Sequence, residues 1–248
     1  CYVNDIAVAV IQLLKRGLRV AYVDIDAHHG NGVQDAFYRD DRVLVISFHQ
    51  NGKDIYPWSG FENEIGEGRG KGFTVNVPLP AGTDDEVFEH AFEEIAPPLL
   101  CAFKPDIVIG ELGADTHLAD PLSDLNLTNL GYSRVVEKLA GLSPRFLGLG
   151  GGGYDLYKTA RNWTLAWAVL NGLDLCGLSI HQTFVSPDAA EREKNVAHTL
   201  HCIELAYTLG IPILRLNTGR WRTIKSFDDF LQRGPYLEGR REDFKDLR

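Results

Sequence analysis

The chain has 248 residues, of which 44% are hydrophobic and 24% charged, and its formal net charge is −9. This composition is ordinary for a soluble globular protein, and the negative charge argues against direct binding to nucleic acid or to an anionic membrane. No apolar run approaches the roughly 20 residues that a membrane-spanning helix requires. The four cysteines are scattered, which favours a reducing, cytoplasmic location over a disulfide scaffold.

Helix and strand patterns alternate along the chain. Apolar spacing predicts a first helix over 5–16, and a strand rich in β-branched residues follows it at 18–26. The later strands are predicted at 43–48, 73–79, 106–112 and 145–150, and the later helices at 84–103, 128–141 and 155–171. Near-continuous apolar strands between amphipathic helices indicate an α/β fold with a mainly parallel sheet flanked by helices.

Polar residues gather at the end of the first predicted strand. The segment YVDIDAHHGNG, residues 22–32, places Asp24, Asp26 and His28 at alternate positions, so that a strand would hold all three on one side. On its own, this pattern could also be a structural hydrogen-bond cluster, with Asp24 a buried and satisfied carboxylate. In a parallel α/β sheet, however, ligands bind beyond the carboxyl ends of the strands.

Two further strands end in polar groups. Asp115 follows the strand that ends at Leu112, and Tyr154 follows the glycine run 150–153. Two carboxylates and an imidazole form a three-ligand site that leaves zinc an open position, as in catalytic zinc sites, and ferrous iron fits the same ligands. Tyr154 taken alone could be a packing residue beside a glycine turn. The glycines would let the backbone approach the site closely.

The segment 50–71 is a long glycine-rich connection, which suggests a functional loop at the rim of the site. Its aromatic residues Tyr56 and Trp58 could pack the loop onto the core or line a substrate channel.

Three motifs together resemble one known family. DIDAHHGNGVQDAF, ELGADT and LGGGGYDLYKTARNWT are similar to motifs of the zinc-dependent histone deacetylase superfamily, in particular its acetoin-utilisation and histone-deacetylase-like members. The resemblance covers residues 1–172. It implies an arginase/deacetylase-type fold and the zinc-dependent hydrolysis of an acetyl or acyl amide, with an acetylated lysine or an acetylated small amine as the substrate.

The resemblance also implies roles for individual residues. Asp26, His28 and Asp115 would bind zinc, Tyr154 would donate a hydrogen bond to the substrate carbonyl oxygen, and Asp24 would orient a catalytic histidine. A structural potassium ion would be bound by backbone carbonyls around Asp24, Asp26 and His28, together with Ser47 and Phe48. The substrate channel would be lined by Tyr56, Gly152 and Leu122.

The general base is the main departure from the family pattern. In the family, a tandem His-His lies shortly before the sequence that resembles CYVND, so we expect this chain to be N-terminally truncated. His29 is expected to point away from the metal, His49 has no partner recognisable from sequence, and His117 is expected to be a polar rim residue. Asn31 replaces an aspartate found in many members. An inactive metal-binding fragment or interaction module is therefore the alternative function.

Residues 173–248, the tail, are predicted to form a separate unit. From Leu178 onward it predicts a strand, a helix capped by Ser186 and ended by Gly210, and a second strand. This partial βαβ segment is similar to sugar-phosphate isomerase/epimerase proteins of the TIM-barrel type, which leaves a minor possibility of an isomerase relation. His181, Asn217 and Arg220 come without the carboxylates that a metal would require. The sequence does not determine the origin of this fusion or the oligomeric state.

Overall fold

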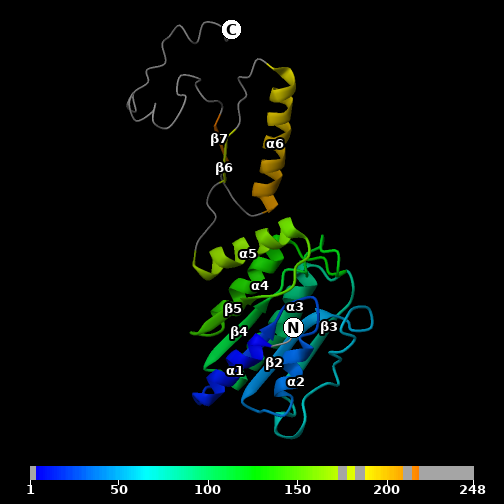
Figure 1. The fold of residues 1–248 in the computed structure, drawn as a ribbon, viewed down its shortest axis with the longest axis vertical. Coiled ribbons are helices and arrows are strands. Elements are labelled where there is room, and N and C mark those ends of the chain that lie inside the picture. The colour runs from blue at the N-terminus through cyan, green and yellow to red at the C-terminus, as the bar shows by residue number, and fades with distance from the viewer. Residues whose placement is uncertain (1–3, 173–177, 182–187, 209–213, 218–248) are drawn as a thin grey trace, which may run out of the picture. The chain divides into compact units, whose positions relative to one another are not determined.

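The computed structural model describes residues 4–172, 178–181, 188–208 and 214–217. Five parallel strands form one sheet in the order β3-β2-β1-β4-β5 (Figure 1). Their bounds are β1 Val20–Asp24, β2 Val43–Gln50, β3 Thr74–Leu79, β4 Ile107–Leu112 and β5 Phe146–Gly150. The central strand β1 is buried along its whole length, as expected for a sheet covered on both faces.

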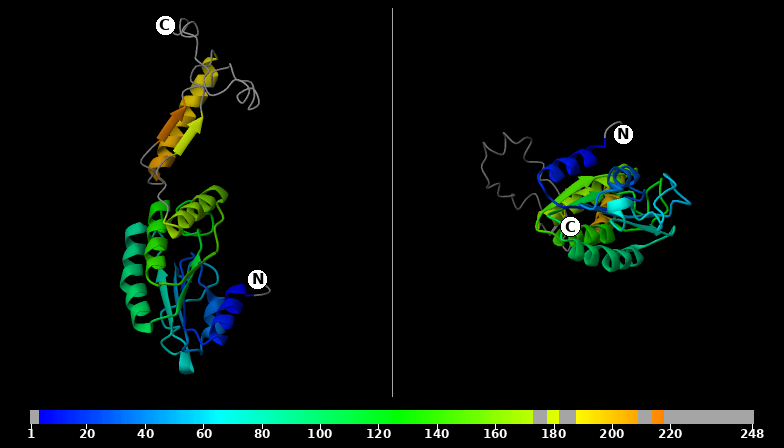
Figure 2. Two further views of the ribbon diagram at one scale, coloured as in Figure 1. Left: turned by 90° about the vertical axis from the view of Figure 1, so that its left-hand side faces the viewer. Right: turned by 90° about the horizontal axis from the view of Figure 1, so that it is seen from below.

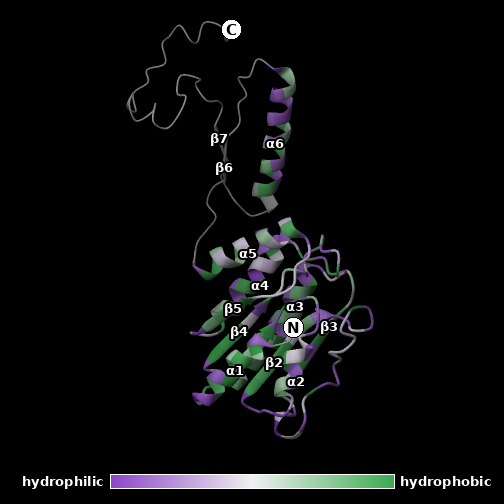
Figure 3. Ribbon diagram, in the orientation of Figure 1, coloured by the Kyte–Doolittle hydropathy of each residue, from purple (hydrophilic) through white to green (hydrophobic). Residues whose placement is uncertain are grey.

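Helices cover the two faces of this sheet. Their bounds are α1 Asp5–Lys15, α2 Asn31–Phe37, α3 Asp85–Phe103, α4 Asn129–Gly141 and α5 Leu156–Leu170, with a short 3₁₀ helix η1 at Gly68–Gly70. Side chains of α1 and α2 pack with Val20 and Tyr22 of β1, whereas those of α3 and α4 pack with Ala21 and Val23. Figure 2 shows these two helix layers on opposite sides of the sheet, and Figure 3 shows the apolar strands between them.

Local sequence signals explain where the long helices begin. Asn4, Asp84, Thr128 and Asp155 each accept a hydrogen bond from a backbone N–H of the first turn. The four helices predicted between residues 5 and 171 are confirmed to within one residue at each end. The short helix α2 was not predicted, because its N-cap is Gly30, which has no capping side chain.

The first strand is shorter than predicted. It ends at Asp24 rather than Asp26, because the Asp24 carboxylate accepts the backbone N–H of Asp26 at 3.0 Å and turns the chain out of the strand. Asp24 therefore closes the strand, whereas Asp26 and His28 lie in the bend that follows it and not along a strand face.

Residues 178–217 include a strand, a helix and a second strand, as predicted. Strands β6 Leu178–His181 and β7 Leu214–Asn217 pair in parallel, and α6 Ala189–Thr208 lies between them in sequence. The predicted cap Ser186, the helix end at Gly210 and Arg220 lie outside the described residues. The barrel likeness and the boundary at residue 173 stay predictions. None of the described helices is long and apolar enough to cross a bilayer.

Candidate metal centre

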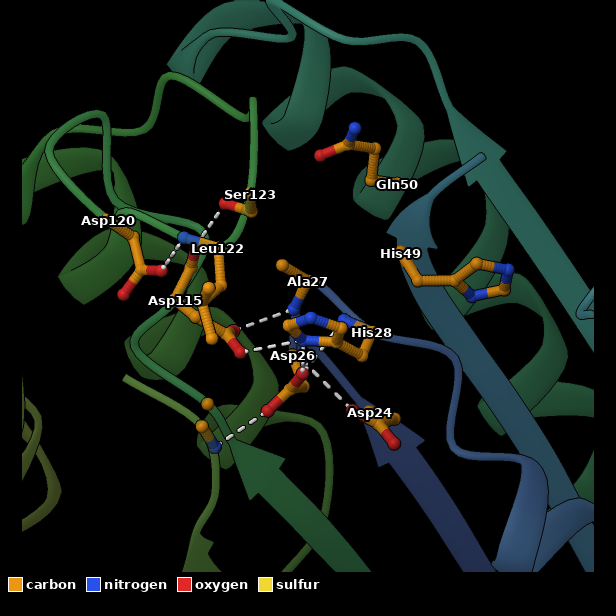
Figure 4. Close-up of polar contacts among 12 residues, drawn as sticks. Asp24, Asp26, Ala27, His28, His49, Gln50, Asp115, Asp120, Leu122 and Ser123 are labelled. Atoms are coloured by element: carbon orange, nitrogen blue, oxygen red, sulfur yellow. Dashed lines mark hydrogen bonds and ion pairs between the residues drawn. The ribbon is translucent and has the colours of Figure 1, made fainter. Parts of the chain in front are cut away.

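The candidate site lies where β1, β4 and β5 end, at the carboxyl edge of the sheet (Figure 4). Asp26 and His28 come from the segment after β1, Asp115 from the loop after β4, and Gly152 from the segment after β5. Because neighbouring parallel strands end at one edge, residues far apart in sequence meet there.

Three predicted ligands converge at this edge. The side-chain donor atoms of Asp26, His28 and Asp115 all lie within 4.8 Å of one another. His28 Nδ1 is 3.1 Å from Asp26 Oδ1 and 2.9 Å from Asp115 Oδ2. Asp115 is fully buried, and His28 retains partial exposure toward solvent. The site is thus closed to solvent at Asp115 and open to solvent at His28.

Backbone N–H groups fix the orientation of both carboxylates. Asp115 Oδ1 accepts from Ala27 N at 2.8 Å, and Asp26 Oδ2 accepts from Gly152 N at 2.7 Å. A Cβ atom added to Gly152 would lie 2.0 Å from Asp115 Oδ2. The expected close approach of the glycine run is confirmed, and it requires the absence of a side chain at this position.

These ligands fit a zinc ion. Bonds of about 2.0–2.2 Å in a tetrahedral site place ligand atoms about 3.4 Å apart. The two His28 contacts of 2.9 and 3.1 Å would therefore open by only a few tenths of an ångström around an ion. Two carboxylates and one imidazole are also the donor types that zinc accepts while keeping a fourth position open.

The electrostatics of the site favour a bound cation. Burial, with the charge of Asp26, raises the pKa of Asp115 to about 7. Burial alone would raise the pKa of Asp26, but hydrogen bonds from His28 and from the Gly152 amide outweigh it and lower that pKa. Burial works against protonation of His28, yet hydrogen bonds with Asp115 and Asp26 raise its pKa to about 10. These protons offset the negative charge of the buried carboxylates. A bound divalent ion would offset it in their place.

Two further buried acids, Asp24 and Glu111, lie beside the proposed ligands. Of these two, Glu111 was not predicted to belong to the site. Asp24 accepts a hydrogen bond from Tyr22 Oη at 2.6 Å and is the register partner of Glu111 on the neighbouring strand β4. Burial and the nearby Asp24 charge raise the pKa of Glu111 well above its usual value, and burial raises that of Asp24 to about 7. The available sequence signal was a glutamate inside the otherwise apolar stretch IVIGEL, residues 107–112.

Tyr154 stands at the open side of the site. Its ring centroid is 6.2 Å from that of His28 in an edge-to-face arrangement, and the side chain is 50% exposed. Burial and the charges of Asp115 and Asp26 raise the pKa of its phenol, which keeps the hydroxyl protonated and able to donate a hydrogen bond. This position agrees with the predicted contact to a substrate carbonyl, which stays a prediction.

Two of the predicted channel residues, Tyr56 and Leu122, lie on the surface, whereas Gly152 is half-buried beside Asp115. Tyr56 is 61% exposed and packs edge-to-face on the equally exposed Trp58, with ring centroids 5.3 Å apart, so neither plugs the loop onto the core. Leu122 is also exposed. Their role in a channel stays a prediction.

Two of the residues predicted to surround a potassium ion, Asp24 and Ser47, lie side by side on neighbouring strands. Ser47 of β2 is the register partner of Asp24, and Ser47 and Phe48 are fully buried. Binding of potassium there also stays a prediction.

The other histidines near the site are held by fixed partners. His29 contacts Ser59 Oγ and Gln34 Oε1 at 2.8 and 3.0 Å, and His49 contacts Ser47 Oγ and the Gly60 carbonyl. His117 was expected at the rim, and this was wrong. It is 3% exposed, because its ring is enclosed between the loop after β4 and helix α4, where it donates from Nε2 to Asn129 Oδ1 at 2.9 Å and accepts at Nδ1 from the Ala119 N–H.

Comparison with known proteins identifies the family. The histone deacetylase domain model matches residues 1–170, so the chain belongs to the histone deacetylase family. Over 169 residues it is 44% identical to histone deacetylase 1 of Homo sapiens and 43% identical to histone deacetylase B of Dictyostelium discoideum, covering 68% of this chain in both cases. These alignments cover 35% and 40% of the two relatives, so the chain spans little more than a third of their length.

Solved structures agree with the family and the fold. An HDAC homologue complexed with SAHA matches with a TM-score of 0.68 and 36% identity, over 80% of this chain and 51% of that structure. An acetylpolyamine aminohydrolase from Burkholderia pseudomallei matches with a TM-score of 0.65 and 34% identity, over 70% of this chain and 51% of that structure. The arginase/deacetylase-type fold and the superfamily are thereby confirmed. The narrower likeness to acetoin-utilisation members stays a prediction.

Proposed function

We propose that residues 1–172 contribute the metal centre of a zinc-dependent deacetylase that hydrolyses an acetyl or acyl amide. The observation that carries this proposal is the convergence of Asp26, His28 and Asp115 beneath Tyr154. When bound to these ligands, zinc would polarise the amide carbonyl and lower the pKa of a water molecule. We propose zinc as the resident ion, with ferrous iron as a substitute and potassium as a structural ion at the carbonyls around Asp24.

The chain's own residues supply binding and orientation. Backbone N–H groups of Ala27 and Gly152 hold the two carboxylates in place, so that the ligands are set before a metal binds. The Tyr154 hydroxyl would donate to the carbonyl oxygen and to the negative charge that develops on it during hydrolysis.

Two substrate classes fit this site, an acetylated lysine and an acetylated small amine. The similar proteins include both histone deacetylases and an acetylpolyamine aminohydrolase. The negative charge of the chain also suits a substrate that carries positive charges next to its acetyl group. A cytoplasmic location and the absence of direct nucleic-acid binding stay predictions.

A second candidate function is metal binding without hydrolysis. His29, His49 and His117 are all engaged by other partners, so none of them is free to accept a proton from the attacking water. General base assistance typically contributes about 10²- to 10⁴-fold to a rate, so hydrolysis by this chain would be slow without a base from elsewhere.

Metal analysis and turnover test both candidates. We expect the purified chain to bind one zinc ion per molecule and Asp26→Ala and Asp115→Ala to lose it. Tyr154→Phe should keep the metal and lower the turnover of acetyl-lysine or acetylated polyamine by about 10²- to 10³-fold. Tyr157→Phe is the matched control, since Tyr157 is 79% exposed on the neighbouring helix.

The outcomes separate the two functions. Unchanged zinc stoichiometry in both aspartate variants would exclude this metal centre. Zinc binding with no turnover by the unmodified chain would favour the non-hydrolytic candidate, and turnover that is insensitive to Tyr154→Phe would contradict the proposed role of the tyrosine.

A further inference from the structure

One buried carboxylate outside the ligand set joins two loops at the mouth of the site. Asp120 is 8% exposed, and its Oδ2 accepts the backbone N–H of Tyr154 at 2.7 Å. Its Oδ1 accepts the backbone N–H of Leu122 at 2.9 Å. The same side chain therefore holds the tyrosine after β5 and the exposed leucine of the loop after β4.

Asp120 is itself fixed by contacts that do not involve Tyr154. Its backbone N–H donates to the His117 carbonyl at 2.8 Å, and the His117 ring is anchored on Asn129 of helix α4. Further along the loop, Ser123 Oγ donates to the carbonyl of Asp115. Figure 4 shows Asp120, Leu122 and Ser123 on the same folded loop as the ligand Asp115. These contacts hold the loop in place independently of Tyr154, so that Asp120 can fix the position of a partner.

The backbone before Tyr154 is anchored as far as Gly152, whose N–H donates to Asp26 and whose carbonyl accepts from the Ala114 N–H, so that only Gly153 lies between this anchor and Tyr154. Gly153 has a φ of 147°, in the region that favours glycine, and without a Cβ it restricts the backbone direction at Tyr154 little. Tyr154 is followed at once by Asp155, the N-cap of α5. The position of the half-exposed Tyr154 ring therefore depends on where its amide is held.

We propose that Asp120 is a positioning residue for the deacetylase reaction. By holding the Tyr154 amide it sets the distance of the phenol from the metal ligands, and by holding the Leu122 amide it places a wall of the substrate channel relative to that phenol. This inference rests on the proposed function, because positioning has a consequence only if Tyr154 contacts the substrate.

The test compares Asp120→Ala and Asp120→Asn with Asp155→Asn in the zinc-loaded full chain. Asp155 is the matched control, because it also accepts two backbone N–H groups, those of Tyr157 and Lys158, and asparagine is an equally good N-cap. A displacement of about 1 Å at a reacting group can cost about 10²-fold in rate. We expect about a 10²-fold loss of kcat in Asp120→Ala, a smaller loss in Asp120→Asn, little change in KM, and unchanged zinc affinity in both.

A double variant separates positioning from general destabilisation. If Asp120 acts through the tyrosine hydroxyl, Asp120→Ala should lower kcat much less when it is combined with Tyr154→Phe. Binding of acetohydroxamate to the zinc-loaded chain gives a second measurement that does not depend on turnover. We expect Tyr154→Phe and Asp120→Ala each to weaken it by about tenfold, the value of one hydrogen bond, and Asp155→Asn to leave it unchanged.

One outcome would overturn only the inference about Asp120, and another would overturn the proposed function as well. If Asp120→Ala matches Asp155→Asn in both measurements while Tyr154→Phe is impaired, the inference about Asp120 is overturned and the proposed function stands. If the unmodified chain shows no turnover and binds acetohydroxamate no better than Tyr154→Phe, the proposed function fails and the inference fails with it.

Discussion

Gly152→Ala adds a single methyl group where the backbone lies against the proposed metal ligands Asp115 and Asp26. A Cβ at this position would lie 2.0 Å from Asp115 Oδ2 and 2.8 Å from Asp26 Oδ2. Since real Cβ contacts do not fall below 3.0 Å, the Asp115 carboxylate would have to retreat by about 1 Å. The φ of Gly152 lies outside the left-handed region, so the effect is steric and not a matter of backbone strain.

This displacement is large compared with what a metal site tolerates. Metal–ligand distances are held to about ±0.2 Å, so a carboxylate displaced by about 1 Å no longer coordinates the ion together with the other two ligands. Disturbing groups that only orient the ligands already weakens metal binding by about 10- to 100-fold. We therefore expect the zinc Kd of Gly152→Ala to rise by at least about 100-fold and its metal-free form to lose about 1–3 kcal/mol of stability by overpacking.

Zinc titration against a chromophoric chelator measures the Kd, and urea unfolding in excess chelator measures the stability. Gly150→Ala is the matched control from the same glycine run, because its Cβ would lie an ordinary 3.4 Å from the Trp163 ring. It should bind zinc within about threefold of the unmodified chain. Normal zinc affinity in Gly152→Ala would refute the reasoning, since the ion could not then be held between the residues that the added methyl group displaces.

Three further predictions concern stability and the extent of the site. In the metal-free protein, folding raises the pKa of His28 from 6.5 to about 10 and those of Asp24 and Asp115 from 3.8 to about 7. The stability from the two aspartate protons is therefore lost as the pH rises from about 4 to about 7, and the stability from the His28 proton is lost as the pH rises from about 6.5 to about 10. Urea unfolding with chelator should give a lower free energy at pH 9 than at pH 6.5, and a flat profile would contradict the shifts. Lys104→Gly should stabilise the protein by about 0.5–1 kcal/mol, because the exposed Lys104 ends α3 with a left-handed φ of 52°, and a lower melting temperature would count against this reason. A chain that ends at Asn171 should keep its zinc affinity, because every ligand precedes that residue; loss of binding by a folded shortened chain would show that the tail takes part.

Most of the secondary structure follows from local signals in the sequence. The helix predicted at 84–103 is α3 Asp85–Phe103, even though Pro97 and Pro98 lie inside it, because its cap Asp84 and its apolar spacing outweigh the two prolines. The helix α2 was missed because it has only seven residues and begins at an Asn-Gly pair, a combination more typical of turns. Its stability comes from Val33 and Phe37, which pack beneath α1 and are recognisable only in the folded core.

The sequence by itself determined which residue types stand at the strand ends, and hence the proposed ligands Asp26, His28 and Asp115 and the tyrosine beside them. It could do so because the carboxyl ends of parallel strands share one edge, whatever their order.

Only the tertiary structure decided which of these groups touch. The placement of β1 beside β4 puts Glu111 opposite Asp24, and the path of the chain after β5 brings the Gly152 amide to Asp26, 126 residues earlier in the sequence. In the same way the Tyr154 amide reaches Asp120 across 34 residues. Such contacts depend on strand order, register and loop path, which arise from packing of the whole core and leave no local pattern in the sequence.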